Sequence, residues 1–481
     1  MKRLSFFLIL IVAVNLNVQV AQDVAASAAL KWFSQISGEI TTPEQISKAQ
    51  SFHHNNQTLF YSFSFKDGGF VLVSADKRTK PILGYSTTND FISSNTGNAV
   101  ELNSLPSSPV KELLTEYAEQ INTIKLNKNI TEHGEWDRIT KGGTSVVHNS
   151  NDVEPLTDAL WGQGYPYNIY CPLLSSGQRT VAHCGATAMA ILLRHYKFPS
   201  HGLSSVSYSW QGQTLAADFS AATYDYDKMP TSLTNATEEE IHQVAQLSYH
   251  CGLAQYVNYG IPYSYSQYDW WNSIPDAFEL YFGYERPLVK YKQAYSAADW
   301  EQLLINELSE GCPIFYWSDG SGGHFWVLDG YQEPGYFHMN WGWNGAGNGY
   351  FTLDNLVIGS IAFTSTQAAF INLRPNLSVS SVSDEQILPE DFQLKQNYPN
   401  PFNPTTTINY TIPSVGTRHV VSTKLTVTNL LGQVISTLVD KDQTPGIYNA
   451  TFNASSFPSG VYFYTLVAGN FVQTKKLVLL K

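Results

Sequence analysis

Hydrophobic and polar positions alternate with different periods along the chain, and the first region, residues 22–140, mixes helical and strand-like stretches. Its predicted elements are a helix at 25–36, strands at 58–65 and 70–74, and a helix near 110–124. Gly68 and Gly69 lie between the two strands, and glycine adopts the positive φ angles of a hairpin turn. A polar, glycine-bearing stretch at 141–155 follows, which we interpret as a cleavable linker.

The second and largest region, residues 156–373, has helical periodicity first and strand-like runs later. A helical period begins near Cys184 and is ended by Pro199. Thr237 and Glu240 form a capping box for a second helix, with Gly252 as its predicted end. Further predicted elements are a helix capped by Ser296 and strands at 314–317, 325–328, 336–340 and 349–353. This order indicates an α+β fold.

The third region contains strand patterns only. Residues 374–390 are rich in Ser, Asp, Glu and Pro, and we interpret them as a linker. Short strand-like runs recur with turn residues between them from position 391 to 481. The predicted strands are 405–412, 424–428, 433–439, 447–452, 461–467 and 471–479. Short, regularly spaced strands predict a small β-sandwich.

The N-terminus, residues 1–21, has the pattern of a signal peptide. Lys2 and Arg3 precede an apolar run at 4–14, and the small Ala21 offers a cleavage point. No later segment approaches 18 continuous apolar residues, so we expect no transmembrane segment. The chain is 43% hydrophobic and 14% charged, which is a globular composition. Its formal net charge of −12 argues against a nucleic-acid partner.

Cys184 is the candidate nucleophile among the four cysteines. It lies at the predicted start of a helix, where unpaired N–H groups stabilise a thiolate. Position alone leaves an inert buried cysteine equally open. Cys171, Cys251 and Cys312 adjoin prolines or lie on an apolar helix face, which favours packing roles. The sequence does not show which cysteines, if any, form a disulfide, and no CxxC pair indicates a zinc site.

His324 is the candidate general base. It follows Gly322 and Gly323 and opens a strand, so a ligand can approach the backbone closely. Asn340, at the end of the next predicted strand, is a candidate orienting partner, although a turn role is equally open. We rank His183 and His338 below His324. No metal-binding array, phosphate loop or dinucleotide motif is present, so we expect no cofactor.

Three sequence blocks then carry a resemblance to the streptopain family of papain-like cysteine proteases, peptidase family C10. The blocks are Trp161-Gly162-Gln163-Gly164-Tyr165-Pro166, Cys184-Gly185-Ala186-Thr187-Ala188-Met189, and Gly323-His324-Phe325-Trp326-Val327-Leu328-Asp329-Gly330 with His338-Met339-Asn340-Trp341-Gly342-Trp343. The resemblance implies that Cys184 is the nucleophile and His324 the base. It also implies that Gln163 contributes to the oxyanion hole and that Asn340 and Trp341 orient and shield the histidine.

One block departs from the family pattern. The family usually has Gly-Cys-Val around its nucleophile, whereas this chain has His183-Cys184-Gly185. A bulky, titratable residue before the nucleophile can change the local backbone or the pKa of the thiol. We expect efficiency and pH optimum to respond to it, and the catalytic roles to stay the same.

The two outer regions carry resemblances of their own. The stretch Gly68-Gly69-Phe70-Val71-Leu72-Val73-Ser74-Ala75-Asp76-Lys77-Arg78 resembles the pro-segment of the family. The stretch Leu394-Lys395-Gln396-Asn397-Tyr398-Pro399-Asn400-Pro401 resembles type IX secretion sorting domains. The first implies an intramolecular inhibitor of the active site. The second implies an immunoglobulin-like β-sandwich that addresses the protein to the type IX machinery.

These inferences predict a secreted cysteine endopeptidase made as a zymogen. It would be exported through the periplasm, reach the medium or the outer cell surface, and cleave protein or peptide substrates after its prodomain is removed. Two alternative hypotheses are kept. A transglutaminase or amidase would use the same chemistry with another acceptor. A non-catalytic surface protein would use the aromatic cleft for binding, but this alternative is disfavoured because the whole set of site residues is present.

Overall fold

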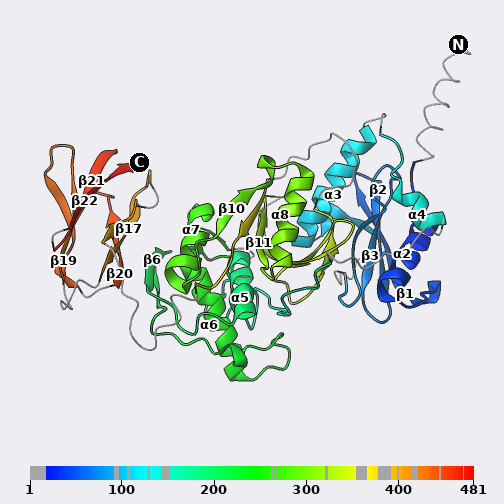
Figure 1. Cartoon of the computed structure of the whole chain (residues 1–481), viewed down its shortest axis with the longest axis horizontal. Coiled ribbons are helices and arrows are strands. Elements are labelled where there is room, and N and C mark those ends of the chain that lie inside the picture. Colours follow the sequence, from blue (N-terminus) through cyan, green and yellow to red (C-terminus); the bar gives the residue numbers. More distant parts are fainter. Residues whose placement is uncertain are drawn as a thin grey trace, which may run out of the picture.

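The computed structural model describes residues 18–91, 97–105, 109–126, 130–141, 152–261, 264–266, 269–319, 323–353, 366–376, 392–397, 400–413, 421–443, 446–469 and 471–480. Most of the predicted signal peptide and of both predicted linkers lies outside these residues. Three parts follow one another along the molecule (Figure 1). None of the helices within the described residues combines the length and apolar character needed to span a bilayer.

The N-terminal part is a helix-flanked sheet. Its elements are α2 (Gln22–Ser37), β1 (Ile46–His54), β2 (Gln57–Phe65), β3 (Phe70–Ser74), β4 (Ile82–Ser86), β5 (Ala99–Glu101), α3 (Pro109–Leu126) and α4 (Glu135–Lys141). The predicted hairpin joins β2 to β3, and Gly68 and Gly69 have φ angles of 93° and 91°. The pattern missed β1, β4, β5 and α4.

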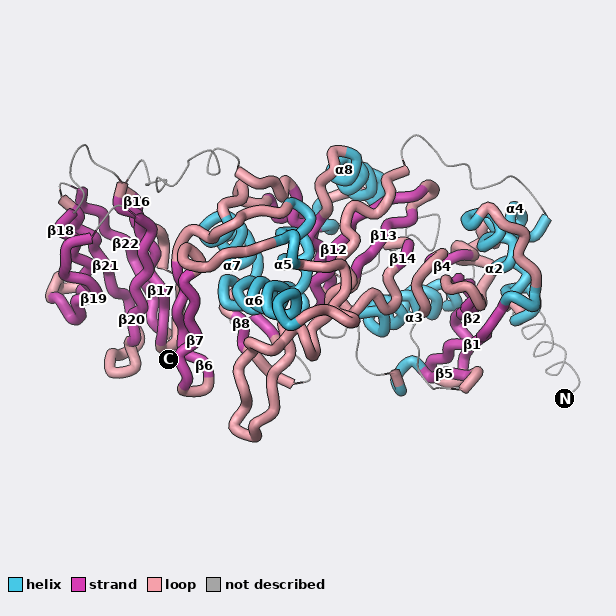
Figure 2. Tube along the Cα trace, turned by 90° about the horizontal axis from the view of Figure 1, so that it is seen from below, coloured by secondary structure: helices cyan, strands magenta, loops and turns pink. Residues whose placement is uncertain are grey.

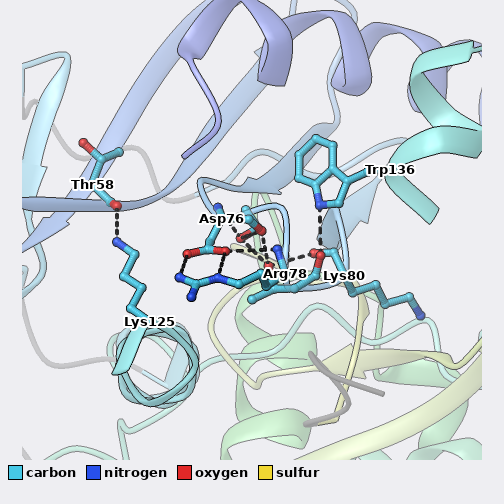
Figure 3. Close-up of polar contacts among 8 residues, drawn as sticks. Thr58, Asp76, Arg78, Lys80, Lys125 and Trp136 are labelled. Carbon is cyan, nitrogen blue, oxygen red and sulfur yellow. Dashed lines mark hydrogen bonds and ion pairs between the residues drawn. The ribbon is translucent and has the colours of Figure 1, made fainter. Parts of the chain in front are cut away.

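A buried ion pair anchors the loop that follows β3. Arg78 donates from Nε and Nη2 to the two carboxylate oxygens of Asp76, over 2.9 and 2.6 Å. Figure 3 shows the side chain of Lys80 extending away from the Asp76–Arg78 ion pair. Its ammonium group reaches the carbonyl of Pro334, in the central part of the chain, at 2.6 Å. The loop therefore connects the N-terminal part to the central part.

In the central part, short strands that the pattern did not predict lie between the helices, and the predicted antiparallel strands follow the last helix. Its helices are α5 (Cys184–Tyr196), α6 (Glu238–Ala254), α7 (Trp270–Asp276) and α8 (Ala297–Ser309). Its strands are β6 (Ser205–Trp210), β7 (Gln213–Asp218), β8 (Val257–Asn258), β9 (Tyr265–Ser266), β10 (Leu288–Tyr291), β11 (Ile314–Ser318), β12 (His324–Gln332), β13 (Tyr336–Asn340), β14 (Gly349–Phe351) and β15 (Gln367–Ile371).

Local signals explain two of these helices. The Thr237 hydroxyl caps α6 by accepting from the Glu240 N–H, and Ser296 caps α8 in the same way. The predicted end of α6 at Gly252 was wrong, because the helix continues to Ala254. Gly252 lies inside the helix, where the Tyr259 hydroxyl leaves no room for a Cβ atom. Close packing, and not helix termination, therefore explains this glycine.

One sheet runs through the N-terminal and central parts. Its eleven strands have the order β10-β15-β11-β12-β13-β14-β4-β3-β2-β1-β5. β14 and β4 form the joint, where Tyr350 pairs with Tyr85 and Phe351 with Gly84. A common hydrophobic core also crosses the joint. It includes Phe60, Leu72 and Ile121 from the N-terminal side and Trp326, Leu328 and Trp341 from the central side.

The C-terminal part is all β. Its strands are β16 (Gln393–Leu394), β17 (Thr405–Ile412), β18 (Val421–Thr428), β19 (Val434–Gln443), β20 (Gly446–Asn453), β21 (Gly460–Ala468) and β22 (Phe471–Leu479). They form one sheet of order β16-β17-β20 and another of order β19-β18-β21-β22, around a core drawn from both. In Figure 2 this part lies beside β6 and β7, and the Asn449 amide donates to the Ser205 carbonyl over 2.9 Å.

Candidate active site

Cys184 is the first residue of α5, as the sequence predicted. His183 precedes it in an extended conformation, with ψ at 144°, and α5 has no acidic residue in its first turn. The Cys184 side chain is half-buried. A thiol here is close to the unpaired N–H groups and positive end of the helix dipole, and no carboxylate in the first turn opposes them.

The other three cysteines have environments that disfavour a thiolate. Cys171, Cys251 and Cys312 are buried free thiols. Burial raises the pKa of Cys171 to about 12 and that of Cys251 well above its ordinary value. It also raises the pKa of Cys312. A thiol that stays protonated is a poor nucleophile, so these residues serve packing.

His324 is the first residue of β12, the strand against which α5 packs. The imidazole is buried, and its Nε2 atom lies 3.2 Å from the carbonyl oxygen of Trp341. Burial is the main reason that the pKa of His324 is lowered to about 3, and the neighbouring His183 lowers it further. A carbonyl can only accept a hydrogen bond, so Nε2 carries the proton and Nδ1 of the neutral ring is basic.

One tryptophan stacks on this histidine, and a second packs against the first. The Trp326 ring stacks on His324 with centroids 6.2 Å apart and planes 12° apart. The Trp341 ring packs against Trp326, with ring centroids 5.1 Å apart. Its indole N–H donates to the Gly347 carbonyl. Trp326 was not among the predicted site residues. Its spacing from His324 indicated such a role, because residues two apart on a strand point to the same face.

Asn340 holds the turn that follows it. Its side-chain amide donates to the Ala159 carbonyl over 2.7 Å and to the Thr157 hydroxyl over 3.3 Å. Its side-chain oxygen accepts from the backbone N–H of Gly342 over 3.3 Å. Asn340 therefore reaches His324 through the turn whose Trp341 carbonyl contacts the imidazole.

The segment that carries Gln163 is hydrogen-bonded to the other two blocks of the site. Its backbone carbonyl accepts from the N–H of Ala182, two residues before the nucleophile, over 2.8 Å. The backbone carbonyl of Trp161, two residues before Gln163, accepts from the N–H of Asn344 over 3.0 Å. This bond connects the segment to the turn that follows Trp341. The side-chain Nε2 of Gln163 is buried and has no hydrogen-bond partner among the described residues. A buried donor without a partner is costly unless a ligand supplies the acceptor.

His183 is buried beside the nucleophile. Its ring meets Phe325, the neighbour of His324, edge to face at 5.8 Å. Burial lowers the pKa of His183 to about 4, against a raising contribution from Gln255. It is therefore a neutral ring at physiological pH. Within the described residues, no group of three or more His, Cys, Asp or Glu side chains is arranged to hold a metal ion.

Three family models match the chain. The peptidase C10 family matches residues 161–351, a span that contains all five predicted site residues, Gln163, Cys184, His324, Asn340 and Trp341. The Spi protease inhibitor family matches residues 17–121. A secretion system C-terminal sorting domain matches residues 396–480. The three matches follow the three parts of the molecule.

Individual proteins show the same likeness. The chain is 28% identical to streptopain of Streptococcus pyogenes over 345 residues, which is 66% of this chain and 80% of streptopain. It is 29% identical over 340 residues to the thiol protease/hemagglutinin PrtT of Porphyromonas gingivalis, covering 66% of this chain and 37% of PrtT. A structure of a prointerpain A fragment from Prevotella intermedia matches with a TM-score of 0.55 and 28% identity, over 68% of this chain and 99% of the fragment. The chain belongs to the peptidase C10 family of cysteine endopeptidases, with an inhibitor-like N-terminal part and a C-terminal sorting domain.

Proposed function

We propose that this endopeptidase cleaves peptide bonds with Cys184 as nucleophile and His324 as general base. One observation carries the proposal: Nε2 of His324 is fixed by a carbonyl, which leaves Nδ1 to accept the thiol proton. The helix N-terminus at Cys184 favours the resulting thiolate. Together they give the thiolate nucleophile that peptide-bond hydrolysis by a cysteine requires.

The proposed reaction has two stages. The thiolate attacks the peptide carbonyl, and His324 gives its proton to the leaving amine as the C–N bond breaks. A water molecule, losing a proton to His324, then attacks the thioester carbonyl. The C–S bond breaks, the peptide acid leaves, and the proton returns to Cys184.

Gln163 is the proposed oxyanion donor. Its buried Nε2 has no acceptor among the described residues, and its segment is hydrogen-bonded to Ala182 beside the nucleophile. A tetrahedral oxyanion would provide the missing acceptor, so the bond would form when charge develops. Asn340 and Trp341 keep their predicted parts in this proposal: they orient His324 through the Trp341 carbonyl and shield it from water.

The outer parts control activity and location. We propose residues 22–140 as an inhibitory prodomain and residues 141–155 as the linker that is cut on activation. Residues 391–481 form an immunoglobulin-like sandwich that directs the protein to the type IX machinery after it crosses the periplasm. The inhibitor and sorting-domain matches support this order of events. The mature enzyme then acts on proteins in the medium or at the outer surface.

Hydrolysis of unfolded casein by the activated protein tests the mechanism. Cys184→Ala and His324→Ala should each abolish turnover and covalent labelling by an epoxide thiol reagent, while Cys312→Ala should retain both. Gln163→Ala should lower kcat by roughly 10²- to 10³-fold. Wild-type rates for Cys184→Ala would refute the proposed mechanism.

A further inference from the structure

Asp329 interrupts the regular pairing of the strand that begins with His324. Leu328 of β12 pairs with Met339 of β13, and Gly330 pairs with His338, so Asp329 is an extra residue on β12. A bulge of this kind turns a side chain away from its regular direction and is frequent beside active sites. The Asp329 side chain is fully buried.

Three donors surround the Asp329 carboxylate. His338 donates from Nδ1 to one oxygen over 2.6 Å. Thr157 donates to the other oxygen from its backbone N–H, over 3.0 Å, and from its hydroxyl. A buried carboxylate is stable only when hydrogen bonds or charges compensate for lost hydration. The carboxylate therefore binds the segment that carries Thr157.

That segment, residues 152–160, is fixed along β12. Val153 exchanges two backbone hydrogen bonds with Tyr331, over 2.7 and 2.8 Å, and Leu156 donates to the Asp329 carbonyl over 2.8 Å. A Cβ atom at Gly330 would lie 3.0 Å from the Val153 carbonyl oxygen. A side chain at this position would therefore disturb the docking of the segment.

A chain of hydrogen bonds leads from this segment to the catalytic base. The Thr157 hydroxyl accepts from the Asn340 amide, and Asn340 in turn accepts from the Gly342 N–H. The Trp341 carbonyl, between Asn340 and Gly342, contacts His324. Displacing Thr157 would remove one of the two acceptors of the Asn340 amide and loosen the turn that orients the imidazole.

We propose that Asp329 and Thr157 are positioning residues, which tie the first segment of the mature enzyme to the turn that orients His324. The proposal rests on the role assigned to His324 above. Asp152 is part of the docked segment, because its carboxylate accepts from the Glu333 N–H over 3.0 Å. Maturation must then cut before Asp152 and leave residues 152–160 in the enzyme.

Thr157→Val tests the proposal in the full-length precursor, which is matured before assay. Valine keeps the shape of threonine but removes the hydroxyl that joins Asp329 to Asn340. We expect kcat to fall roughly ten- to hundredfold, with KM within about twofold of wild type. The midpoint pH for alkylation of Cys184 by iodoacetamide should shift upward, because a misplaced imidazole no longer accepts the thiol proton.

Matched variants separate positioning from packing. Thr157→Ser keeps the hydroxyl and should restore both kcat and the alkylation midpoint. Thr423→Val, a buried threonine in the C-terminal part, should match wild type. Asp329→Asn retains the size of the side chain but weakens it as a hydrogen-bond acceptor. If Thr157→Val fails to mature, kcat and the alkylation midpoint are measured in this variant instead.

Several outcomes would overturn the inference. Wild-type kcat and alkylation in Thr157→Val or in Asp329→Asn would do so. An equal loss in Thr157→Ser and Thr157→Val would also do so, because packing would then explain both. N-terminal sequencing of a fully active enzyme that begins after Thr157 would refute it as well. Full activity of Cys184→Ala would instead refute the underlying mechanism, so the two failures are distinguishable.

Discussion

At the scale of single residues, His183 and Gly185 flank the nucleophile and depend on each other. A Cβ atom at Gly185 would lie 2.6 Å from Oε1 of Gln255 and 2.9 Å from Cε1 of His183. The family pattern of Gly-Cys-Val places its bulk after the cysteine, whereas this chain places it before. The imidazole of His183 thus occupies space that a larger residue at position 185 would need.

Substitutions at these positions should therefore be coupled. Gly185→Val alone should lower kcat/KM and destabilise the enzyme by about 1–3 kcal/mol, because the new side chain overpacks the first turn of α5. Adding His183→Gly removes one of the two contacts and should recover part of both losses, and a double-mutant cycle in kcat/KM and thermal unfolding measures the coupling. Gly460→Val, where a Cβ atom meets open space, is the control. Additive effects would contradict the interdependence.

The sequence predicted Cys184 and His324 because a helix start and a glycine-flanked strand start leave readable patterns. It could not predict the contact between Asn340 and Thr157, which are 183 positions apart. Nor could it show that the Trp341 carbonyl meets His324, since every residue has a carbonyl group and its direction depends on the turn. The bulge at Asp329 could not be predicted either, because the register between two strands depends on both of them.

At the scale of elements, the joint between β4 and β14 depends on small residues. A Cβ atom at Gly84 would collide with the Phe351 ring, and one at Gly349 would lie 2.5 Å from the Tyr85 carbonyl oxygen. Tyr336 reaches across the same interface and donates to the Ile82 carbonyl over 3.0 Å. Strand pairing and side-chain hydrogen bonds therefore both attach the N-terminal part to the protease.

Gly84→Ala should weaken this attachment. The added methyl group separates β4 from β14, so the isolated N-terminal part carrying the substitution should inhibit the mature enzyme at least about tenfold less tightly than wild type. Inhibition constants measured in trans check this result. Gly97→Ala meets nothing within 4 Å and should inhibit normally. Equal inhibition by the Gly84 variant would show that the joint contributes little.

Helix α3 should make the same inhibition depend on pH. Glu116 on α3 accepts from Ser318, the strand partner of His324, over 2.8 Å, and burial raises the pKa of this carboxyl from 4.5 to about 7. A raised pKa means that docking favours the protonated form. The contribution is complete below about pH 4.5 and is lost as pH rises through about 7. Lys292, with its pKa lowered to about 8 by burial, stays charged across this window.

Inhibition by the N-terminal part in trans should therefore weaken by roughly tenfold between pH 5 and pH 7. Glu116→Gln mimics the protonated carboxyl and should give a nearly flat profile over that range, and Glu119→Gln on the exposed face of α3 is the control. A wild-type slope retained in Glu116→Gln would assign the pH dependence to another group.

Secondary structure was predictable wherever an element carries its own pattern. The runs predicted for β3, β13, β17 and β22 match the observed strands end to end. β10 and β15 were not predicted, and β10 is partly exposed and lacks a clear alternation. The continuity of one sheet and one core from the N-terminal part into the protease was not predicted either. That continuity comes from the pairing of β14 with β4, which no local pattern indicates.

At the scale of the whole molecule, the C-terminal part has a hydrophobic core separate from that of the protease, whereas the N-terminal part does not. Its core is built from its own residues, between Leu394 and Leu479. The N-terminal part instead shares a sheet and a core with the protease. A self-contained core can be removed without exposing apolar surface elsewhere, whereas a shared core cannot.

Removing residues 392–481 should therefore separate location from catalysis. The truncated protein, once matured, should keep kcat/KM and its unfolding temperature within about the error of the full-length enzyme, because distant, independent regions contribute additively. In the native host the same truncation should abolish delivery to the cell surface or medium, since the sorting domain is lost. Casein hydrolysis, thermal unfolding and fractionation of cells and medium measure the three effects. A truncated enzyme that is inactive would show that the C-terminal part supports the active site, and normal delivery would show that the export address lies elsewhere in the chain.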